Sequence, residues 1–355
     1  MTEDGLSQLD TQKVFEALRA ELQNFERFKA LQIISSADVA RLGAKTVGTR
    51  WLLTLKPDGT TNARLVAQEL NLGSFEDAYA ATPMSIASRL MLMLAFRRQW
   101  GVFTFDLKAA FLHAPWPAEE KAIVLVPPRF LPPGVDAPPA GHLWRAARAV
   151  YGLRRSPRIY QEWLASRLQQ DGWTRCVADA QLYALWKPAT ALTSKSLVAV
   201  LSIHADDGLF VCSIPTAEFV FKGLEGHCQV KRGPQVLADW VLYLGRELRR
   251  TPQGWQVRAR PTMVTQLLAD FGLAQAKPVS TPGPTAAERV DASQPLSDTE
   301  VTQFRSGVGR LLWMAPVRPE LTYLIKELCR HMQQPTREHM AHLRWLLRFL
   351  AAMLF

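Results

Sequence analysis

The sequence predicts an α+β fold, and two observations indicate it. Pairs of short apolar runs joined by turn residues, at residues 51–67 and 196–214, are typical of β-hairpins. Longer segments at residues 84–98 and 156–170 are typical of helices. Because these strands and helices do not alternate strictly along the chain, a regular repeat of strand and helix is not indicated.

The first 44 residues favour a helical lead-in, because apolar residues recur at helical spacing at Phe15, Leu18 and Leu22. A hairpin follows over residues 51–67. Its two apolar runs flank Asp58-Gly59, a dipeptide that tolerates the positive φ of a tight turn.

Residues 84–98 contain neither Gly nor Pro and predict a buried helix. Its apolar positions include Ile86, Leu90, Leu94 and Phe96. Residues 102–107 predict a short strand. Six prolines predict an irregular loop at residues 127–141. The helix over residues 156–170 is expected to begin with Ser156 as its N-cap and Pro157 at its first position.

Residues 196–214 predict strand, turn and strand, with residues 204–208 in the turn and Gly208 supplying its conformational freedom. Residues 242–258 suggest a further hairpin. Residues 278–295 are rich in Pro, Ser, Thr and Ala and predict a linker, and the chain is helical from residue 298 onward.

Composition indicates a globular chain, since 48% of its 355 residues are hydrophobic and 21% are charged. The net charge of +10 favours a polyanionic partner, nucleic acid first, although many soluble proteins are basic without one. The four cysteines are scattered along the chain and form no C-x-x-C pair, which favours a reducing compartment. The acidic start is not a signal peptide, and no apolar run is long enough to span a bilayer. The expected localisation is intracellular and not secreted.

Three carboxylates stand at the ends of apolar strands. Asp206 and Asp207 are adjacent between two such strands, and Asp106 ends another. If the strands are neighbours in one sheet, the three carboxylates meet at one edge and could hold two Mg²⁺ ions about 3.5–4 Å apart, as phosphoryl-transfer enzymes require. Acidic residues are also ordinary in turns. The residues alone leave both interpretations open.

At these positions the chain resembles the reverse transcriptase of copia-type retrotransposons. The ordered segments that carry the resemblance are Asn62-Ala-Arg-Leu-Val-Ala67, Phe105-Asp-Leu-Lys-Ala-Ala-Phe-Leu112, Tyr151-Gly-Leu-Arg-Arg-Ser-Pro-Arg158, Ile203-His-Ala-Asp-Asp207, Tyr243-Leu-Gly245, Arg305-Ser-Gly-Val-Gly-Arg-Leu-Leu312, Arg318-Pro-Glu-Leu321 and Pro335-Thr-Arg-Glu-His339. They span roughly residues 48–350. Tyr243-Leu-Gly245 resembles the segment that helps to hold the primer.

The resemblance implies a right-hand polymerase fold of fingers, palm and thumb, with an antiparallel palm sheet flanked by helices. We expect a lead-in at residues 1–44, fingers and palm at 45–250, a thumb-like segment and linker at 251–297, and a helical connection toward an absent ribonuclease H domain at 298–355. The implied activity is that of an RNA-directed DNA polymerase, a nucleotidyltransferase that adds deoxynucleoside triphosphates to a DNA primer on an RNA template.

The resemblance also implies roles for single residues. Asp106, Asp206 and Asp207 would bind two Mg²⁺ ions, with Mn²⁺ as a substitute, and the backbone carbonyl of Leu107 could add a ligand. Phe111 would select deoxynucleotides by clashing with a 2′-hydroxyl. The cations expected near the triphosphate or the template are Arg64, Lys56, Arg154, Arg155 and Arg158. Without the resemblance, Phe111 would be interpreted as a core aromatic residue and the cations as surface charges.

Four departures from the family pattern bear on activity. His204-Ala205 replaces the usual Tyr-Val before the paired aspartates, and His204 is expected to be a hydrogen-bonded turn residue more than a metal ligand. Asn62 replaces Lys, Arg155 replaces Gln and His113 replaces Asn.

No ribonuclease H, integrase or zinc-knuckle motif is evident, so we expect a polyprotein fragment, or a decayed or domesticated copy. Its location would be cytoplasmic, in a virus-like particle, or nuclear. The alternatives to an active polymerase are a catalytically silent nucleic-acid-binding remnant and a purely structural role.

Overall fold

The computed structural model describes residues 10–56, 59–70, 78–187, 196–283 and 294–352. Within it the chain divides into two compact units, Met1–Gln235 and Val236–Phe355. Each unit has its own apolar core. The subdomain boundaries expected after residues 44, 250 and 297 stay predictions.

The first unit is built around a six-stranded sheet in which every neighbouring pair is antiparallel. Its strands, in spatial order, are β11 (Val230–Gln235), β4 (Gly101–Leu107), β10 (Asp207–Cys212), β9 (Ser196–His204), β8 (Leu182–Lys187) and β7 (Trp173–Arg175). The predicted strand at residues 102–107 and the strand–turn–strand at 196–214 are thereby confirmed, and they lie side by side in the sheet.

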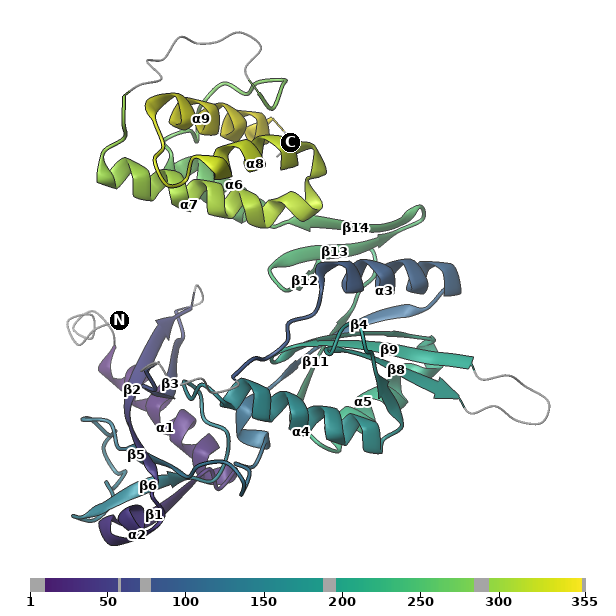
Figure 1. Cartoon of the computed structure of the whole chain (residues 1–355). Helices are drawn as coiled ribbons and strands as arrows, with labels where there is room; N and C mark the ends of the chain where they lie inside the picture. Colours follow the sequence, from purple (N-terminus) through teal and green to yellow (C-terminus); the bar gives the residue numbers. More distant parts are fainter. Residues whose placement is uncertain (1–9, 57–58, 71–77, 188–195, 284–293, 353–355) are drawn as a thin grey trace. The chain divides into compact units, whose positions relative to one another are not determined.

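The two faces of this sheet are covered differently (Figure 1). Helices α4 (Ser156–Gln170) and α5 (Ala217–Glu225) pack on one face, and α3 (Ser85–Arg98) lies on the other. Phe103, Phe105 and Leu107 of β4 all belong to the core beneath α4 and α5. Because successive side chains in a strand point to opposite faces, the residues between them face the other way.

Helix α3 is present as predicted, but the face that it buries is different. Ile86 and Leu90 are 49% and 55% exposed, whereas Ala87, Met91 and Ala95 are buried. The helix is apolar on nearly all sides, so its sequence contains no clear amphipathic signal. Ala87, Met91 and Ala95 recur at every fourth position and form the buried face of the helix, so the expectation that Ile86 and Leu90 are buried is wrong.

The turn between β9 and β10 is tighter than predicted. His204 pairs directly with Asp207, so the turn consists of Ala205 and Asp206, and Ala205 adopts the positive φ of 54°. Gly208 lies inside β10, opposite Phe105 of β4. A methyl group at Gly208 would overlap the Phe105 ring. The glycine therefore makes room for this ring, and its predicted role in the turn is wrong.

This unit also contains a five-stranded sheet, which has an apolar core of its own. Its spatial order is β1 (Leu31–Ser35), β6 (His142–Ala146), β5 (Ile123–Val126), β2 (Lys45–Leu55) and β3 (Thr61–Ala67). The predicted hairpin is confirmed as the β2–β3 pair, although Asp58 lies outside the described residues. Helix α1 (Thr11–Arg27) packs against β3, and the short helix α2 (Ser36–Arg41) follows β1.

Two local predictions in this unit are wrong. Residues 31–35 are not helical, because Leu31–Ser35 pairs with β6 in a sheet that the local sequence does not show. Ser156 is not the N-cap of α4; that position is held by Arg155, and the Ser156 side chain is fully buried inside the first turn. The predicted loop at residues 127–141 contains neither helix nor strand.

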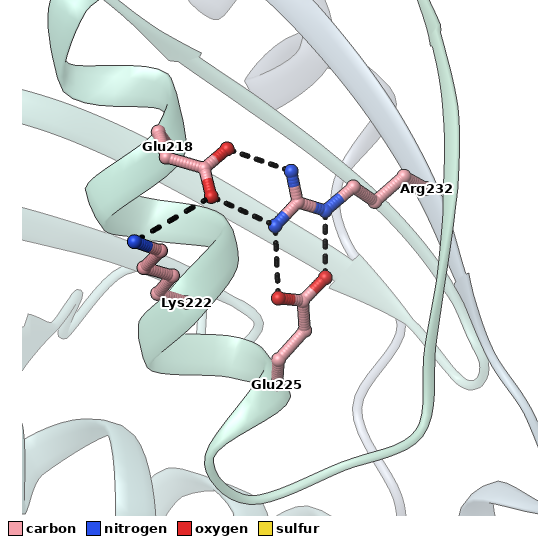
Figure 2. A network of polar contacts seen from close by, with 4 residues as sticks. All are labelled: Glu218, Lys222, Glu225 and Arg232. Atoms are coloured by element: carbon pink, nitrogen blue, oxygen red, sulfur yellow. Dashed lines mark hydrogen bonds and ion pairs between the residues drawn. The ribbon is translucent and has the colours of Figure 1, made fainter.

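An ionic network joins α5 to β11 (Figure 2). Arg232 of β11 donates from Nε to Glu225 at 2.6 Å and from Nη1 to Glu218 at 2.7 Å. Its guanidinium also lies over the ring of Phe221, 4.5 Å from the centroid. Lys222 pairs with Glu218 at 4.0 Å. The network fixes the edge strand β11 against the helix that covers its neighbours.

The second unit combines a three-stranded antiparallel sheet with four helices. The elements are β12 (Val241–Tyr243), β13 (Arg246–Thr251), β14 (Gly254–Ala259), α6 (Pro261–Asp270), α7 (Asp298–Met314), α8 (Thr322–Arg330) and α9 (Arg337–Ala351). The predicted hairpin and the C-terminal helices are confirmed, and α6 was not anticipated. Of the predicted linker at 278–295, residues 284–293 lie outside the described part of the chain. Across the described residues, no helix combines the length and apolarity that crossing a membrane requires.

Candidate active site

Four polar side chains form a row across four neighbouring strands of the six-stranded sheet. Lys231 of β11 is the register partner of Asp106 of β4, and Asp106 is the partner of Asp207 of β10. Asp207 in turn pairs with His204 of β9. Directly opposed residues of antiparallel strands point to the same face. The row therefore lies on the face opposite α4 and α5, because Phe105, the neighbour of Asp106, points into the core on that side.

Asp206 lies next to this row, in the β9–β10 turn. Its carbonyl oxygen accepts a 2.8 Å hydrogen bond from the backbone N–H of Leu107, which ties the turn to the end of β4. The backbone thus brings the two acidic segments together, although a hundred residues separate them in the sequence. The expectation that Asp106, Asp206 and Asp207 meet at one edge of a sheet agrees with this register.

Mutual repulsion and burial both act on these acids. Desolvation raises the pKa of Asp106, and the charge of Asp206 raises it further, while Lys231 lowers it. Desolvation likewise raises the pKa of Asp207, with Asp206 and Asp106 adding to the effect. Asp106 and Asp207 therefore ionise less readily than an isolated carboxyl group. A bound cation would relieve this repulsion, since an opposite charge favours the ionised form.

The chemistry of the donor set suits Mg²⁺, which prefers hard carboxylate oxygens. The side chains nevertheless do not form a closed ligand set. Among the described residues, no group of three or more His, Cys, Asp or Glu side chains stands ready to hold a metal ion. The register places Asp106 and Asp207 on one face, and the turn places Asp206 beside them.

Aromatic side chains lie close to the acids. Phe111, on the 3₁₀ turn η2 (Ala110–His113), packs against Tyr151 with ring centroids 4.9 Å apart and against Tyr160 at 5.6 Å. Arg64 of β3 lies over the Tyr151 ring, 5.4 Å from its centroid. Burial raises the pKa of Tyr151 to about 12, and the charges of Arg64, Glu21 and Asp206 act on it as well. Tyr151 therefore connects Phe111, Arg64 and the acidic turn.

The glycine after Tyr151 holds this ring in place. Gly152 adopts a φ of +88°, and a methyl group there would overlap the carbonyl oxygen of Ala67. The backbone N–H of Ala67 donates to the carbonyl of Tyr151 at 2.7 Å. Only a residue without a side chain permits this approach, so Tyr151-Gly152 is fixed against the end of β3, the strand that carries Arg64.

The predicted cations have different surroundings. Arg64 is exposed, and its charge lowers the pKa of Asp106, so it lies within electrostatic range of the row. Lys56 is exposed at the end of the β2–β3 hairpin. The backbone N–H of Arg154 donates to Glu69 at 2.6 Å, Arg155 forms an ion pair with Glu120, and Arg158 is half-buried on α4. The structure thus associates Arg64 with the acids, and the other predicted roles stay predictions.

Two residues of the site were missed by reasoning from the sequence. Lys231 pairs with Asp106 only because β11 joins the edge of the sheet, and no local signal marks a lysine as the partner of a distant acid. Tyr151 was noted only as part of a family segment. Its position before a glycine, next to a run of arginines, was the signal that could have identified it.

Comparison with known proteins gives concordant results. The model of the family described as "Reverse transcriptase (RNA-dependent DNA polymerase)" matches residues 38–285. The chain is 30% identical over 315 residues to a retrovirus-related Pol polyprotein from transposon RE1 of Arabidopsis thaliana, covering 86% of this chain and 20% of that protein. It is 22% identical over 364 residues to the Pol polyprotein from transposon TNT 1-94 of Nicotiana tabacum, covering 97% of this chain and 26% of the relative. The chain therefore spans between a fifth and about a quarter of the length of these relatives.

Among solved structures, the chain is similar to a foamy viral protease-reverse transcriptase in complex with double-stranded DNA. That likeness covers 90% of this chain and 47% of the other, with 13% sequence identity and a TM-score of 0.37. The fold is therefore described from the strands and helices of this chain alone.

Proposed function

Since the chain belongs to the reverse transcriptase (RNA-dependent DNA polymerase) family, we propose that it is the polymerase part of a copia-type transposon Pol polyprotein. It would extend a DNA primer with deoxynucleoside triphosphates on an RNA template and then on DNA. The six-stranded sheet would be the palm, the five-stranded sheet the fingers, and the second unit the thumb and the connection beyond it.

One observation supports this proposal above all others. Asp106 and Asp207 are direct register partners on adjacent strands, and Asp206 stands in the turn beside them. Two carboxylates on one face of an antiparallel sheet, with a third in the adjoining turn and with Lys231 and His204 at the two ends of the row, suit the binding of cations and phosphates. The opposite face is filled by the core beneath α4 and α5 and is closed to substrate.

Mg²⁺ would be held by Asp106, Asp206 and Asp207, with the carbonyl of Leu107 as a further ligand and Mn²⁺ as a substitute. When bound, two such ions activate the primer hydroxyl group and neutralise the charge that develops on the leaving pyrophosphate. The positive charge of the cations would offset the mutual repulsion of these acids.

Other side chains would position the nucleotide. The guanidinium of Arg64 can donate two parallel hydrogen bonds to phosphate oxygens, and Lys56, Arg154, Arg155 and Arg158 would add positive charge. The ring of Phe111, held between Tyr151 and Tyr160, would lie beneath the sugar and exclude a 2′-hydroxyl. Template and primer would be bound chiefly through their phosphates, with an affinity that falls as salt rises.

Primer extension on poly(rA)–oligo(dT) with Mg²⁺ tests the proposal. We expect the native chain to extend the primer, and Asp206→Asn to lower the rate about a hundredfold or more, because a lost metal ligand removes several kcal/mol of transition-state stabilisation. Asp136→Asn is the matched control, since Asp136 is an exposed acid in the proline-rich loop.

Two results would contradict the proposal. No extension by the native chain would exclude an active polymerase and leave the silent nucleic-acid-binding remnant. Extension that survives Asp206→Asn would exclude this carboxylate as a metal ligand.

A further inference from the structure

A cavity lies in the first unit, and the row of acids takes no part in its described lining. It has a volume of about 390 Å³ and is open to solvent. Its walls come from η2, α4 and the segments that follow α1, β6 and α5. The lining residues that carry the argument are Phe28, His113, Arg148, Trp163, Arg167 and His227. Its described lining includes none of the three carboxylates and none of the cations predicted for the nucleotide site.

The cavity is rich in nitrogen donors. Arg148 donates from Nη1 to the carbonyl of His113 at 2.6 Å, which orients one edge of its guanidinium and uses one of its five N–H groups. Arg167 lies on α4, and His227 pairs with Asp171 through Nε2 at 2.9 Å. Burial lowers the pKa of His113, and the charges of Arg148 and of nearby Arg27 lower it further. Positive charge therefore prevails here, and Asp171 is engaged by His227.

Aromatic rings flank these donors. The rings of Trp163 and His113 are stacked, with centroids 6.0 Å apart and planes at 25°. Phe28 meets His113 edge to face at 4.6 Å. The guanidinium of Arg167 lies 5.9 Å from the Trp163 centroid. Trp163 is only partly buried, so its indole reaches both the core and the cavity.

A basic rim beside aromatic faces is the combination that binds a phosphate and a base together. Guanidinium groups donate paired hydrogen bonds to phosphate oxygens, and bases stack on aromatic rings. A purely apolar ligand would leave the arginines without a counter-charge, and a simple anion would leave the rings unused.

We propose that this cavity binds one nucleotide unit, with its phosphate on Arg148 and Arg167 and its base against Trp163. The site is distinct from the row of Asp106, Asp206 and Asp207 and does not depend on polymerisation. The ligand is either a free mononucleotide or the phosphorylated end of a nucleic-acid strand, since both present the same chemistry.

Titration calorimetry of the full chain with AMP, in EDTA and without deoxynucleoside triphosphates, tests this site by itself. We expect saturable binding that Arg167→Glu weakens about tenfold or more, because the substitution replaces a charge-assisted hydrogen bond to the phosphate by repulsion. Arg167→Lys keeps the charge and should retain most of the affinity. Arg41→Glu changes the net charge equally at an exposed residue of α2 and should leave the affinity unchanged.

Adenosine and inorganic phosphate, titrated separately, should each bind at least about tenfold more weakly than AMP, since each makes only half of the contacts. The proposal is overturned if AMP shows no saturable binding, if Arg167→Glu and Arg148→Gln both bind like the native chain, or if phosphate binds as tightly as AMP. Competition by a 5′-phosphorylated oligonucleotide, but not by its 5′-hydroxyl form, assigns the ligand to a strand end. No competition by either oligonucleotide assigns it to the free nucleotide.

Discussion

At the scale of single residues, the site requires that Gly208 has no side chain. Replacing it by Ala would drive a methyl group into the Phe105 ring. We expect Gly208→Ala to destabilise the first unit by about 1–3 kcal/mol or more, because overpacking a filled core forces neighbouring groups apart. Urea unfolding followed by fluorescence measures the loss.

The matched control is Gly223→Ala in α5. A methyl group there would meet only the Asp171 carboxylate, at an ordinary 3.8 Å. Ala is favoured over Gly inside a helix by roughly 0.5–1 kcal/mol, so this variant should be slightly more stable than the native chain. Equal stability of the two variants would show that the Phe105 ring has room to move.

Phe111 carries the predicted discrimination against ribonucleotides. In Phe111→Ala the sugar would no longer meet a ring, and we expect the preference for deoxynucleotides to fall by about one to two orders of magnitude. The ratio of kcat/KM for dTTP and UTP on the same primer and template measures it. Phe111→Tyr keeps the ring and should keep the preference, and a preference unchanged in Phe111→Ala would return this residue to the interpretation as a plain core aromatic.

At the scale of elements, the contact between α5 and β11 should depend on pH. Hydrogen bonds from Arg232 lower the pKa of Glu218 and of Glu225 below the ordinary value of 4.5. A carboxyl group with a lowered folded-state pKa stabilises the fold above its unfolded pKa, and that stabilisation is lost as pH falls through the folded pKa. We therefore expect the Tm of the native chain to exceed that of Arg232→Met at about pH 7, and the difference to shrink below pH 4.5.

Thermal unfolding followed by circular dichroism across this pH range makes the comparison. Arg97→Met, which removes an exposed arginine from the last turn of α3, controls for the loss of a positive charge. A difference between native and Arg232→Met that is the same at every pH would show that the network contributes through packing on Phe221 alone.

Elements with a strong local pattern were predictable, and those defined by distant partners were not. The β2–β3 hairpin and α4 carry turn residues and apolar spacing that decide their form within a few residues. Leu31–Ser35 is a strand only because β6, a hundred residues later, pairs with it. The buried face of α3 depends on which side the sheet approaches, and an almost uniformly apolar helix does not encode that choice.

The same division applies to the site. The three acids were predictable, since isolated carboxylates at the ends of apolar strands are unusual and the surrounding segments resemble a known family. The pairing of Lys231 with Asp106 was not, because the register between strands far apart in sequence depends on the packing of the whole sheet. The cavity around Trp163 and Arg167 gathers residues from five separate segments, none of which forms a motif.

At the scale of the molecule, two compact units imply two unfolding events. The core of the first unit and that of the second are built from separate residues. Leu343→Ala, at a fully buried position of the second core, should cost about 2–5 kcal/mol and shift one transition in urea. Gly208→Ala should shift the other. A single transition that both variants move equally would show that the units unfold as one.

The Phe105 ring fills the space beside Gly208, and this limits which substitutions related sequences can accept. A transposon copy released from selection can exchange Asp206 for Asn and still fold, since that side chain is only half-buried, in a turn outside the core. The same copy cannot replace Gly208 by any other residue without disturbing the strands that carry the acids. Among decaying relatives, a change at Asp206 should therefore mark copies that have become silent but remain folded, whereas a change at Gly208 should mark copies whose product no longer folds.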